Sequence, residues 1–227
     1  MKKRVFYTEI AYVIGLLLLS FGTALMEAAD FGVSMVVAPA YLIYLKVSQF
    51  LPFFTFGMAE YMLQAVILIA MTVILRKFKF SYLFSFVTAV LYGLALDGFM
   101  VVVALMPMNN IALRLIFYIV GMFLVSAGVS LFFQTYISPE AYEMFVKEVS
   151  KKFNVNIHKF KTCYDCISCA VAIVMSFVFF GLWHFEGIKI GTVFCALLNG
   201  WIISRFTKLF NRIWTFEDKL KLRKFFE

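Results

Sequence analysis

The chain has 227 residues, of which 63% are hydrophobic and only 15% are charged, and its mean hydropathy is +0.92. A soluble domain is about half apolar and a quarter charged, so this composition excludes an ordinary soluble protein. The formal net charge of +8 could suggest nucleic-acid binding. The basic residues, however, form short clusters between apolar runs, a pattern typical of loops that face anionic lipid, and we expect no nucleic-acid partner.

Six apolar runs are long enough to cross a bilayer, which takes about 20 helical residues. They comprise residues 10–28, 57–75, 81–105, 112–134, 163–185 and 189–205. The first run follows a basic N-terminus and resembles a signal peptide. No polar domain follows it and a related segment recurs later in the chain, so we interpret it as the first membrane span.

Two weaker segments, 34–51 and 138–153, each follow the first span of one half of the chain. The second begins with Ser138 and Pro139, which favour a helix start, and continues with apolar residues at helical spacing. It predicts an amphipathic helix on the membrane surface. The first is more apolar and contains Pro39, and it is compatible with a re-entrant helix, an interfacial helix or a short span.

The distribution of positive charge predicts the orientation. With six spans and the N-terminus inside, every basic residue except Lys46, Arg114 and Lys189 falls on the inner side. The positive-inside rule therefore favours cytoplasmic termini, together with a cytoplasmic 76–80 loop and 135–162 region. The basic, amphipathic tail 207–227 is expected to rest on anionic lipid headgroups at the cytoplasmic surface.

An internal repeat organises the spans. Residues 12–25, YVIGLLLLSFGTAL, match residues 118–131, YIVGMFLVSAGVSL, at six positions with an offset of 106 residues. At nearly the same offset, the segment around Glu60 aligns with that around Asp165. The last spans of the two halves align as well, which places Gly93 on Gly200.

Each repeat unit contains a span, a weak helix and two further spans, and the units comprise residues 1–106 and 107–206. Because the number of spans in a unit is odd, the second unit must enter the membrane from the opposite side. We therefore predict an all-α integral membrane protein with six transmembrane helices in an inverted 3+3 repeat. Each repeat is expected to have an extra short or interfacial helix after its first span.

Apart from Glu27 at the outer end of the first run, three acidic residues stand inside apolar runs, where charged side chains are rare and usually face protein or water. Asp97 is the deepest, and the neighbouring Gly93 and Gly98 permit close helix approach or local unwinding. It could line a substrate or ion pathway together with Gly93 and Gly200, or it could make a structural hydrogen bond to a neighbouring backbone. We expect it to be shielded from lipid near the centre of the repeat.

Glu60 and Asp165 occur early in their spans, near opposite membrane surfaces. There the positive end of a helix favours an anion. They are either a pair of symmetry-related structural anchors or two gates at the mouths of one central path.

Three cysteines, Cys163, Cys166 and Cys169, are spaced three residues apart. On a regular helix this spacing spreads them around the axis, so they cannot all face one metal ion. We expect no metal and no cofactor. The sequence has no hydrolase constellation or nucleotide-binding fingerprint, and an enzyme is not expected.

A family resemblance adds to these observations. Gly-Val-Ser at 32–34, Gly57 at the start of the next span, and Gly93 followed by Asp97 resemble the YczE/YitT-like bacterial membrane proteins. The resemblance covers most of residues 10–205. It implies a location in the bacterial plasma membrane and supplies no substrate.

Inverted repeats are common in secondary transporters. We therefore expect a transporter or exporter of a small molecule that works by alternating access. The alternatives are a ligand-binding membrane subunit that needs a partner, a regulatory scaffold, and a channel if 34–51 enters the bilayer. The bilayer itself, with anionic lipids, is the expected partner, and a homo-oligomer is compatible with the sequence.

Overall fold

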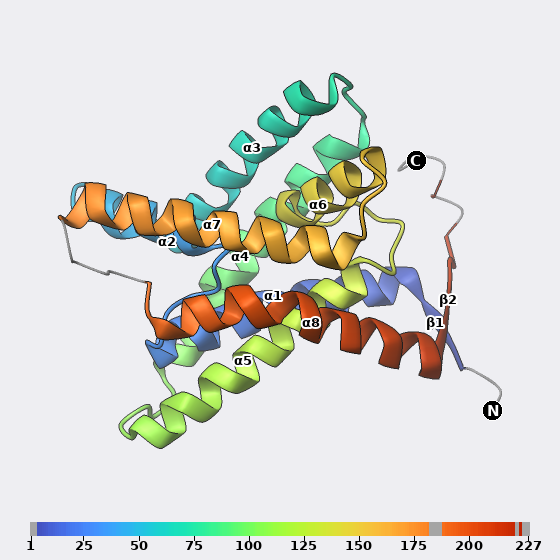
Figure 1. Cartoon of the computed structure of the whole chain (residues 1–227). Coiled ribbons are helices and arrows are strands. Elements are labelled where there is room, and N and C mark those ends of the chain that lie inside the picture. Colours follow the sequence, from blue (N-terminus) through green and yellow to red (C-terminus); the bar gives the residue numbers. More distant parts are fainter. Residues whose placement is uncertain (1–3, 182–187, 221–222, 224–227) are drawn as a thin grey trace.

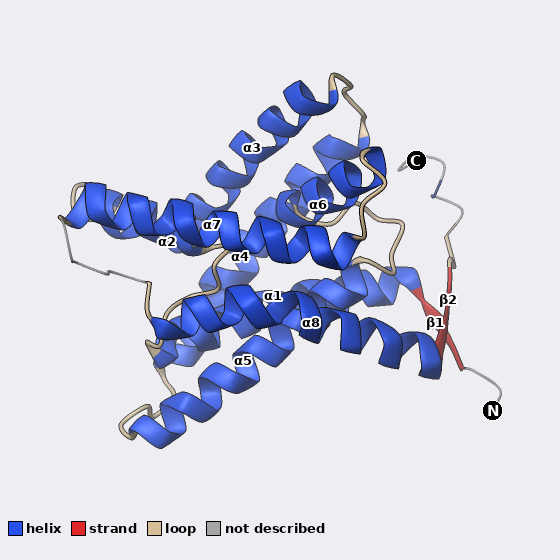
Figure 2. Cartoon of the chain, in the orientation of Figure 1, coloured by secondary structure: helices blue, strands red, loops and turns tan. Residues whose placement is uncertain are grey.

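The computed structural model describes residues 4–181, 188–220 and 223, and it is almost entirely helical (Figures 1 and 2). The helices are α1 (Thr8–Ala29), α2 (Ala38–Val47), α3 (Phe56–Leu75), α4 (Ser81–Ala104), α5 (Ile111–Phe132), α6 (Ala141–Lys152), α7 (Ile157–Phe180) and α8 (Ile190–Ile213). Helices α1, α3, α4, α5, α7 and α8 are long and apolar enough to cross a membrane. The six predicted spans are therefore confirmed.

The boundaries of α7 and α8 differ most from those predicted. Helix α7 ends at Phe180, and residues 182–185 of the predicted span lie outside the described residues. Helix α7 begins at Ile157, six residues before the apolar run, because Asn156 caps it by accepting hydrogen bonds from the backbone N–H groups of His158 and Lys159. Helix α8 continues beyond residue 205 to Ile213. An apolar run marks only the lipid-compatible part of a helix, and both helices continue into polar sequence.

The repeat is visible in the contact between α1 and α5. A Cβ atom on Gly15 would lie 3.1 Å from the carbonyl oxygen of Gly128, and one on Gly22 would lie 2.7 Å from that of Gly121. The sequence alignment equates Gly15 with Gly121 and Gly22 with Gly128. Exchanging the two units therefore turns one glycine contact into the other, as a two-fold axis between antiparallel helices requires.

The remaining helix pairs follow the same exchange. Contacts of α1 with α4 are matched by those of α5 with α8, and contacts of α3 with α4 by those of α7 with α8. The short helices cross between the units, because α2 packs on α7 and α6 packs on α3. The structure is thus an inverted repeat in which each short helix contacts the other unit.

Helices α2 and α6 are half-length and begin in the protein interior. Helix α2 has ten residues and so spans about 15 Å, half of the hydrocarbon core, which excludes a full span for 34–51. Its first residue, Ala38, is buried, whereas Phe50 just beyond its end is exposed. Pro39 fits the first helical turn, where its missing N–H has no intrahelical partner to lose.

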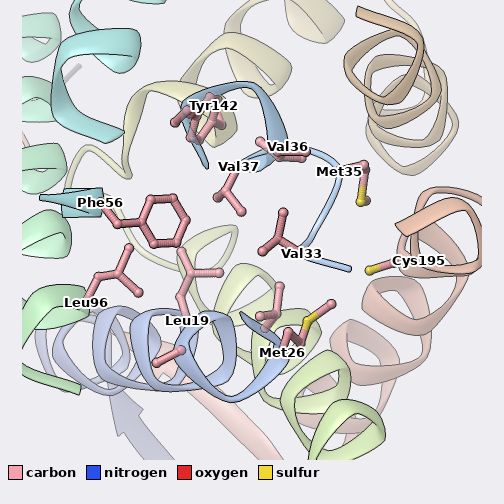
Figure 3. Packing of buried hydrophobic residues seen from close by; sticks show 14 of the residues in the cluster. Leu19, Met26, Val33, Met35, Val36, Val37, Phe56, Leu96, Tyr142 and Cys195 are labelled. Atoms are coloured by element: carbon pink, nitrogen blue, oxygen red, sulfur yellow. The ribbon is translucent and has the colours of Figure 1, made fainter. Parts of the chain in front are cut away.

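Helix α6 corrects our expectation for 138–153, because it does not rest on the outside of the bundle. Ala141, Tyr142 and Glu143 are buried, and only the far end of the helix, followed by Phe153, is exposed. The polar face turns inward because it finds a buried basic partner, described below. Figure 3 shows Val36 and Val37, which precede α2, near Tyr142 of α6 in the core.

The far ends of the two short helices point in different directions. The Lys46 ammonium near the end of α2 donates to the carbonyl oxygen of Phe179, at the end of α7. The Lys152 ammonium at the end of α6 donates to the carbonyl oxygen of Ile74, at the end of α3. Because α3 and α7 are inverted copies, α2 and α6 enter the bundle from opposite ends and their N-termini meet in the middle.

The two described ends of the chain lie together on one side (Figure 1). Strand β1 (Arg4–Tyr7) pairs in parallel with β2 (Trp214–Glu217), and the Phe6 ring stacks on that of Trp214 at 4.8 Å. Within the 207–227 tail, which we expected to be amphipathic, the helix therefore ends at Ile213. The extended conformation is favoured at 214–217 because β1 supplies backbone partners for it.

Candidate functional site

Five ionisable side chains gather where α3, α6 and α7 meet. Glu60, Glu140, Glu143, Lys161 and Asp165 are each at most 3% exposed. Side chains of this kind are almost never fully buried unless they are paired, because removing a charge from water is costly. Four carboxyl groups and one ammonium group in one interior region are therefore the strongest candidate for a functional site.

Lys161 is at the centre of the charged network. Its Nζ atom is 3.0 Å from Glu143 Oε1 and 3.1 Å from Asp165 Oδ1. Asp165 Oδ2 also accepts a hydrogen bond of 3.3 Å from the amide of Asn199, whose own oxygen accepts one of 2.8 Å from the Ser126 hydroxyl. One lysine thus links α6 and α7, and the chain of hydrogen bonds continues to α8 and α5.

Gln64 connects the network to α3. Its Nε2 atom donates to Glu140 Oε2 at 3.1 Å and to Glu60 Oε2 at 3.4 Å. Its Oε1 atom accepts from the backbone N–H of Ala141 at 2.9 Å, which satisfies a free donor at the start of α6. The Tyr142 hydroxyl donates to Glu60 Oε2 at 3.1 Å. The N-terminus of α6 is therefore fixed against α3.

Glu140 and Glu143 form a carboxyl pair at the start of α6. Both side chains line one buried cavity, and Glu143 Oε2 has no hydrogen-bond partner among the described residues. Burial, followed by the neighbouring Glu143 carboxylate, holds the pKa of Glu140 well above its usual range. Glu140 lies outside the six apolar helices. Burial without a cationic partner favours the neutral form of a carboxyl group.

A small cavity adjoins the pair. Its volume is about 10 Å³, enough for roughly one water molecule. Its polar lining comprises Thr23, Ser34, Tyr92, Glu140, Glu143, Lys161 and Asn199. Tyr92 and Asn199 are near the midpoints of α4 and α8, so the cavity is close to mid-height in the bundle.

Glu60 and Asp165 belong to the same buried network. Both are fully buried. The Tyr142 hydroxyl of α6 donates to Glu60, and Lys161 links Asp165 to Glu143 of α6. Our explanation by exposed helix ends is therefore wrong. It fails for Asp165 also because α7 starts early, which places this residue in the third turn. The charges are held by side-chain partners rather than by a helix terminus.

Asp97 is outside the network and has a different set of partners. Its Oδ1 atom accepts from the backbone N–H of Gly57 at 2.9 Å, and Oδ2 accepts from the Thr55 hydroxyl at 2.8 Å. It thus holds the first turn of α3 against α4. This arrangement corresponds to the structural alternative that we considered, a hydrogen bond to neighbouring backbone.

The two glycines that we selected are at helix-packing contacts. Gly93 packs on the backbone of Gly57, and Gly200 packs on the Thr162 side chain, where an added Cβ would clash. These contacts are equivalent in the two units, α3 with α4 and α7 with α8. Among the described residues, neither glycine is part of the cavity lining.

Sequence reasoning missed Glu140, Glu143 and Lys161 as site residues. Glu140 and Glu143 are in the segment that we predicted as a surface helix, and we counted Lys161 among the basic residues of the cytoplasmic 135–162 region. One signal was available: Lys161 precedes Asp165 by four residues, the spacing of an ion pair on one helix face.

Comparison with known proteins gives a family but no function. A family model described as a family of unknown function, DUF6198, matches residues 6–208. No curated protein and no solved structure matches the chain. The family match does not test the resemblance to YczE/YitT-like proteins, which stays a prediction. Since the match covers most of the chain, this protein belongs to the DUF6198 family of unknown function.

Proposed function

We propose that this protein is a secondary transporter or exporter of a small molecule, working by alternating access between its two inverted units. The observation that carries the proposal is the buried charge network at the meeting point of two half-helices. Ionisable residues inside a membrane bundle typically mark ion or substrate pathways. Inverted-repeat transporters place such sites near mid-membrane, beside interrupted helices, where the repeats meet.

The conformation described here supports a closed state in this scheme. The cavity of about 10 Å³ beside Glu143 admits no solute larger than water. Access from either side would require α2 or α6 to separate from its neighbours. Because these helices enter from opposite ends and each packs on the other unit, a relative movement of the units would open one side and close the other.

The proposal includes a bacterial plasma-membrane location with cytoplasmic termini. It is supported by the clustering of basic residues and by the pairing of the two ends of the chain. Anionic lipids are the proposed partners of these clusters. A cysteine at position 78, on a background without native cysteines, should be labelled only after the membrane is permeabilised. Labelling by an impermeant reagent in intact cells would reject this orientation.

The function is tested in two steps. The purified protein in detergent is first screened by thermal shift against pools of metabolites, because a bound solute stabilises the folded state. Solutes that bind are then tested for flux in proteoliposomes. Flux of such a solute, reduced in Glu143→Gln and retained in Glu148→Gln, supports the proposal. Glu148 is the matched control because it is on the same helix but pairs with Lys79, outside the network.

The outcomes separate the competing functions. Binding without flux under any imposed ion gradient would reject a transporter and favour a ligand-binding subunit that depends on a partner. Neither binding nor flux would favour a scaffold. The proposal contains no catalytic step.

A further inference from the structure

We propose that the Glu140–Glu143 pair holds one transferable proton and that the proton is the coupling ion; this rests on the transport function proposed above. The first argument is a balance of charge. Lys161 pairs with Glu143 and Asp165, whereas Glu140 is 3% exposed and has no cationic partner among the described residues. An ionised Glu140 beside an ionised Glu143 would be an uncompensated buried charge, so the pair holds one proton.

The partners of the pair decide which residue carries the proton. Glu143 Oε1 accepts from the Lys161 ammonium at 3.0 Å, and this cation favours the ionised form of Glu143. Glu140 receives only a neutral amide donor, from Gln64. Glu140 is therefore the acid, and Glu143 Oε2, which has no donor among the described residues, is the free acceptor of the pair.

The surroundings reinforce this assignment. The ionisable groups that act on the pair from the packed helices are Tyr12 of α1, Glu60 of α3, Tyr92 of α4, Tyr142 of α6, and Lys161, Tyr164 and Asp165 of α7. Lys161 is the one cation in this set, and Asp165 shares it. A second negative charge on the pair would have no cation of its own, so the proton stays while the site is closed.

Hydrogen bonds from α4 hold the turn that precedes the pair. The Ser85 hydroxyl of α4 donates to the carbonyl oxygen of Pro139, and the Thr88 hydroxyl donates to that of Ser138. These bonds fix the turn that leads into Glu140. On this side, the pair therefore loses its buried setting when α4 and α6 separate.

Release follows from hydration. When one side opens, water reaches the pair and stabilises both carboxylates. The proton passes from Glu140 to water on that side, and the charge of the pair changes from minus one to minus two. Closing the site again requires a proton to return, from whichever side is then open. This requirement couples the conformational cycle to proton movement.

Of the two half-helices, only α6 carries acidic residues at its N-terminus. Helix α2, the counterpart of α6, begins Ala-Pro-Ala-Tyr with no acid in its first turn, and its N-cap residue is Val37. The N-cap of α6 is Glu140, and Glu143 is in its first turn. Within the described part of the chain there is therefore one such pair, not two related by the repeat.

Infrared spectroscopy of the purified protein tests the proton directly, without a transported solute. Neutral pH is well above the pKa of about 4.3 of a free Glu, which would be ionised there. For this protein we nevertheless expect the carbonyl band of a protonated carboxylic acid at neutral pH. The band should lose intensity in Glu140→Gln and keep it in the control Glu148→Gln; the remaining intensity is assigned to Glu60, which is also buried with only neutral donors. A wild-type protein without the band at neutral pH would overturn the proposal even if the variant did not fold, and so would an unchanged band in Glu140→Gln.

A second measurement separates this proposal from the proposed transport function. Proteoliposomes with a solute identified by the thermal-shift screen are given a pH gradient. We expect wild type to accumulate the solute and Glu140→Gln to exchange it without accumulating it. Accumulation in Glu140→Gln equal to wild type would refute proton coupling and leave transport intact. The infrared band without any wild-type flux would instead refute transport and leave the protonated pair established.

Discussion

Replacing Lys161 by methionine should destabilise the protein strongly. The ammonium group is 1% exposed and lies within 3.1 Å of two carboxylates, those of Glu143 and Asp165. Methionine keeps most of the side-chain volume, so the packing changes little and the main loss is electrostatic. Breaking a buried ion pair by removing one partner costs about 3–5 kcal/mol, because the other charge remains buried without compensation.

The same reasoning predicts a rescue. Lys161→Met combined with Glu143→Gln and Asp165→Asn has no uncompensated charge at this point, and should recover most of the lost stability. The single variant should also become more stable as the pH falls, since protonation neutralises the two remaining carboxylates. Denaturant unfolding in detergent micelles measures both effects. A single variant within about 1 kcal/mol of wild type, or a triple variant no better than the single one, would refute a paired, water-excluded network.

Three further predictions concern the frame around the network. Gly22→Leu should lower the free energy of unfolding by about 1–3 kcal/mol or more, because its Cβ would lie within 3 Å of backbone atoms of α5. Gly98→Leu is the control and should cost little, because nothing lies within 4 Å of the added Cβ. Thermal unfolding of both variants measures the difference. Asp97→Ala removes the acceptor for the first turn of α3 and should cost about 1–3 kcal/mol. Unchanged stability in that variant would contradict its capping role. Cysteines at Val5 and Thr215, which are directly paired in β1 and β2, should form a disulfide under mild oxidation; failure to cross-link would contradict the strand pairing.

The spans and the repeat could be predicted because they depend on local, periodic information. Apolar runs identify lipid-facing helices, and Gly15, Gly22, Gly121 and Gly128 recur at one offset because the same backbone contact is made twice. The beginning of α7 could not be found this way. Its first turns carry Lys161, whose charge resembles that of a loop residue until its buried partners are known.

The site itself depends on distant contacts that no local pattern contains. Glu143 looks like part of a solvated face of α6, and only the approach of Lys161 from α7 explains why it turns inward. Gln64 is one polar residue in an apolar run, and its role is apparent only when it meets Glu140 and the start of α6. Glu60 and Asp165 were found from the repeat, but their common network required the fold.

The glycine contacts between α1 and α5 have a consequence for the origin of the chain. A contact whose two members exchange on a half-turn is the interface of a symmetric dimer. A single unit could therefore have met a second copy of itself through the same glycines, provided that the two copies inserted in opposite directions. In one fused chain the two halves need not be identical. Helix α6 can therefore carry two acids at its N-terminus while α2 carries none, a difference that no homodimer of identical units could encode.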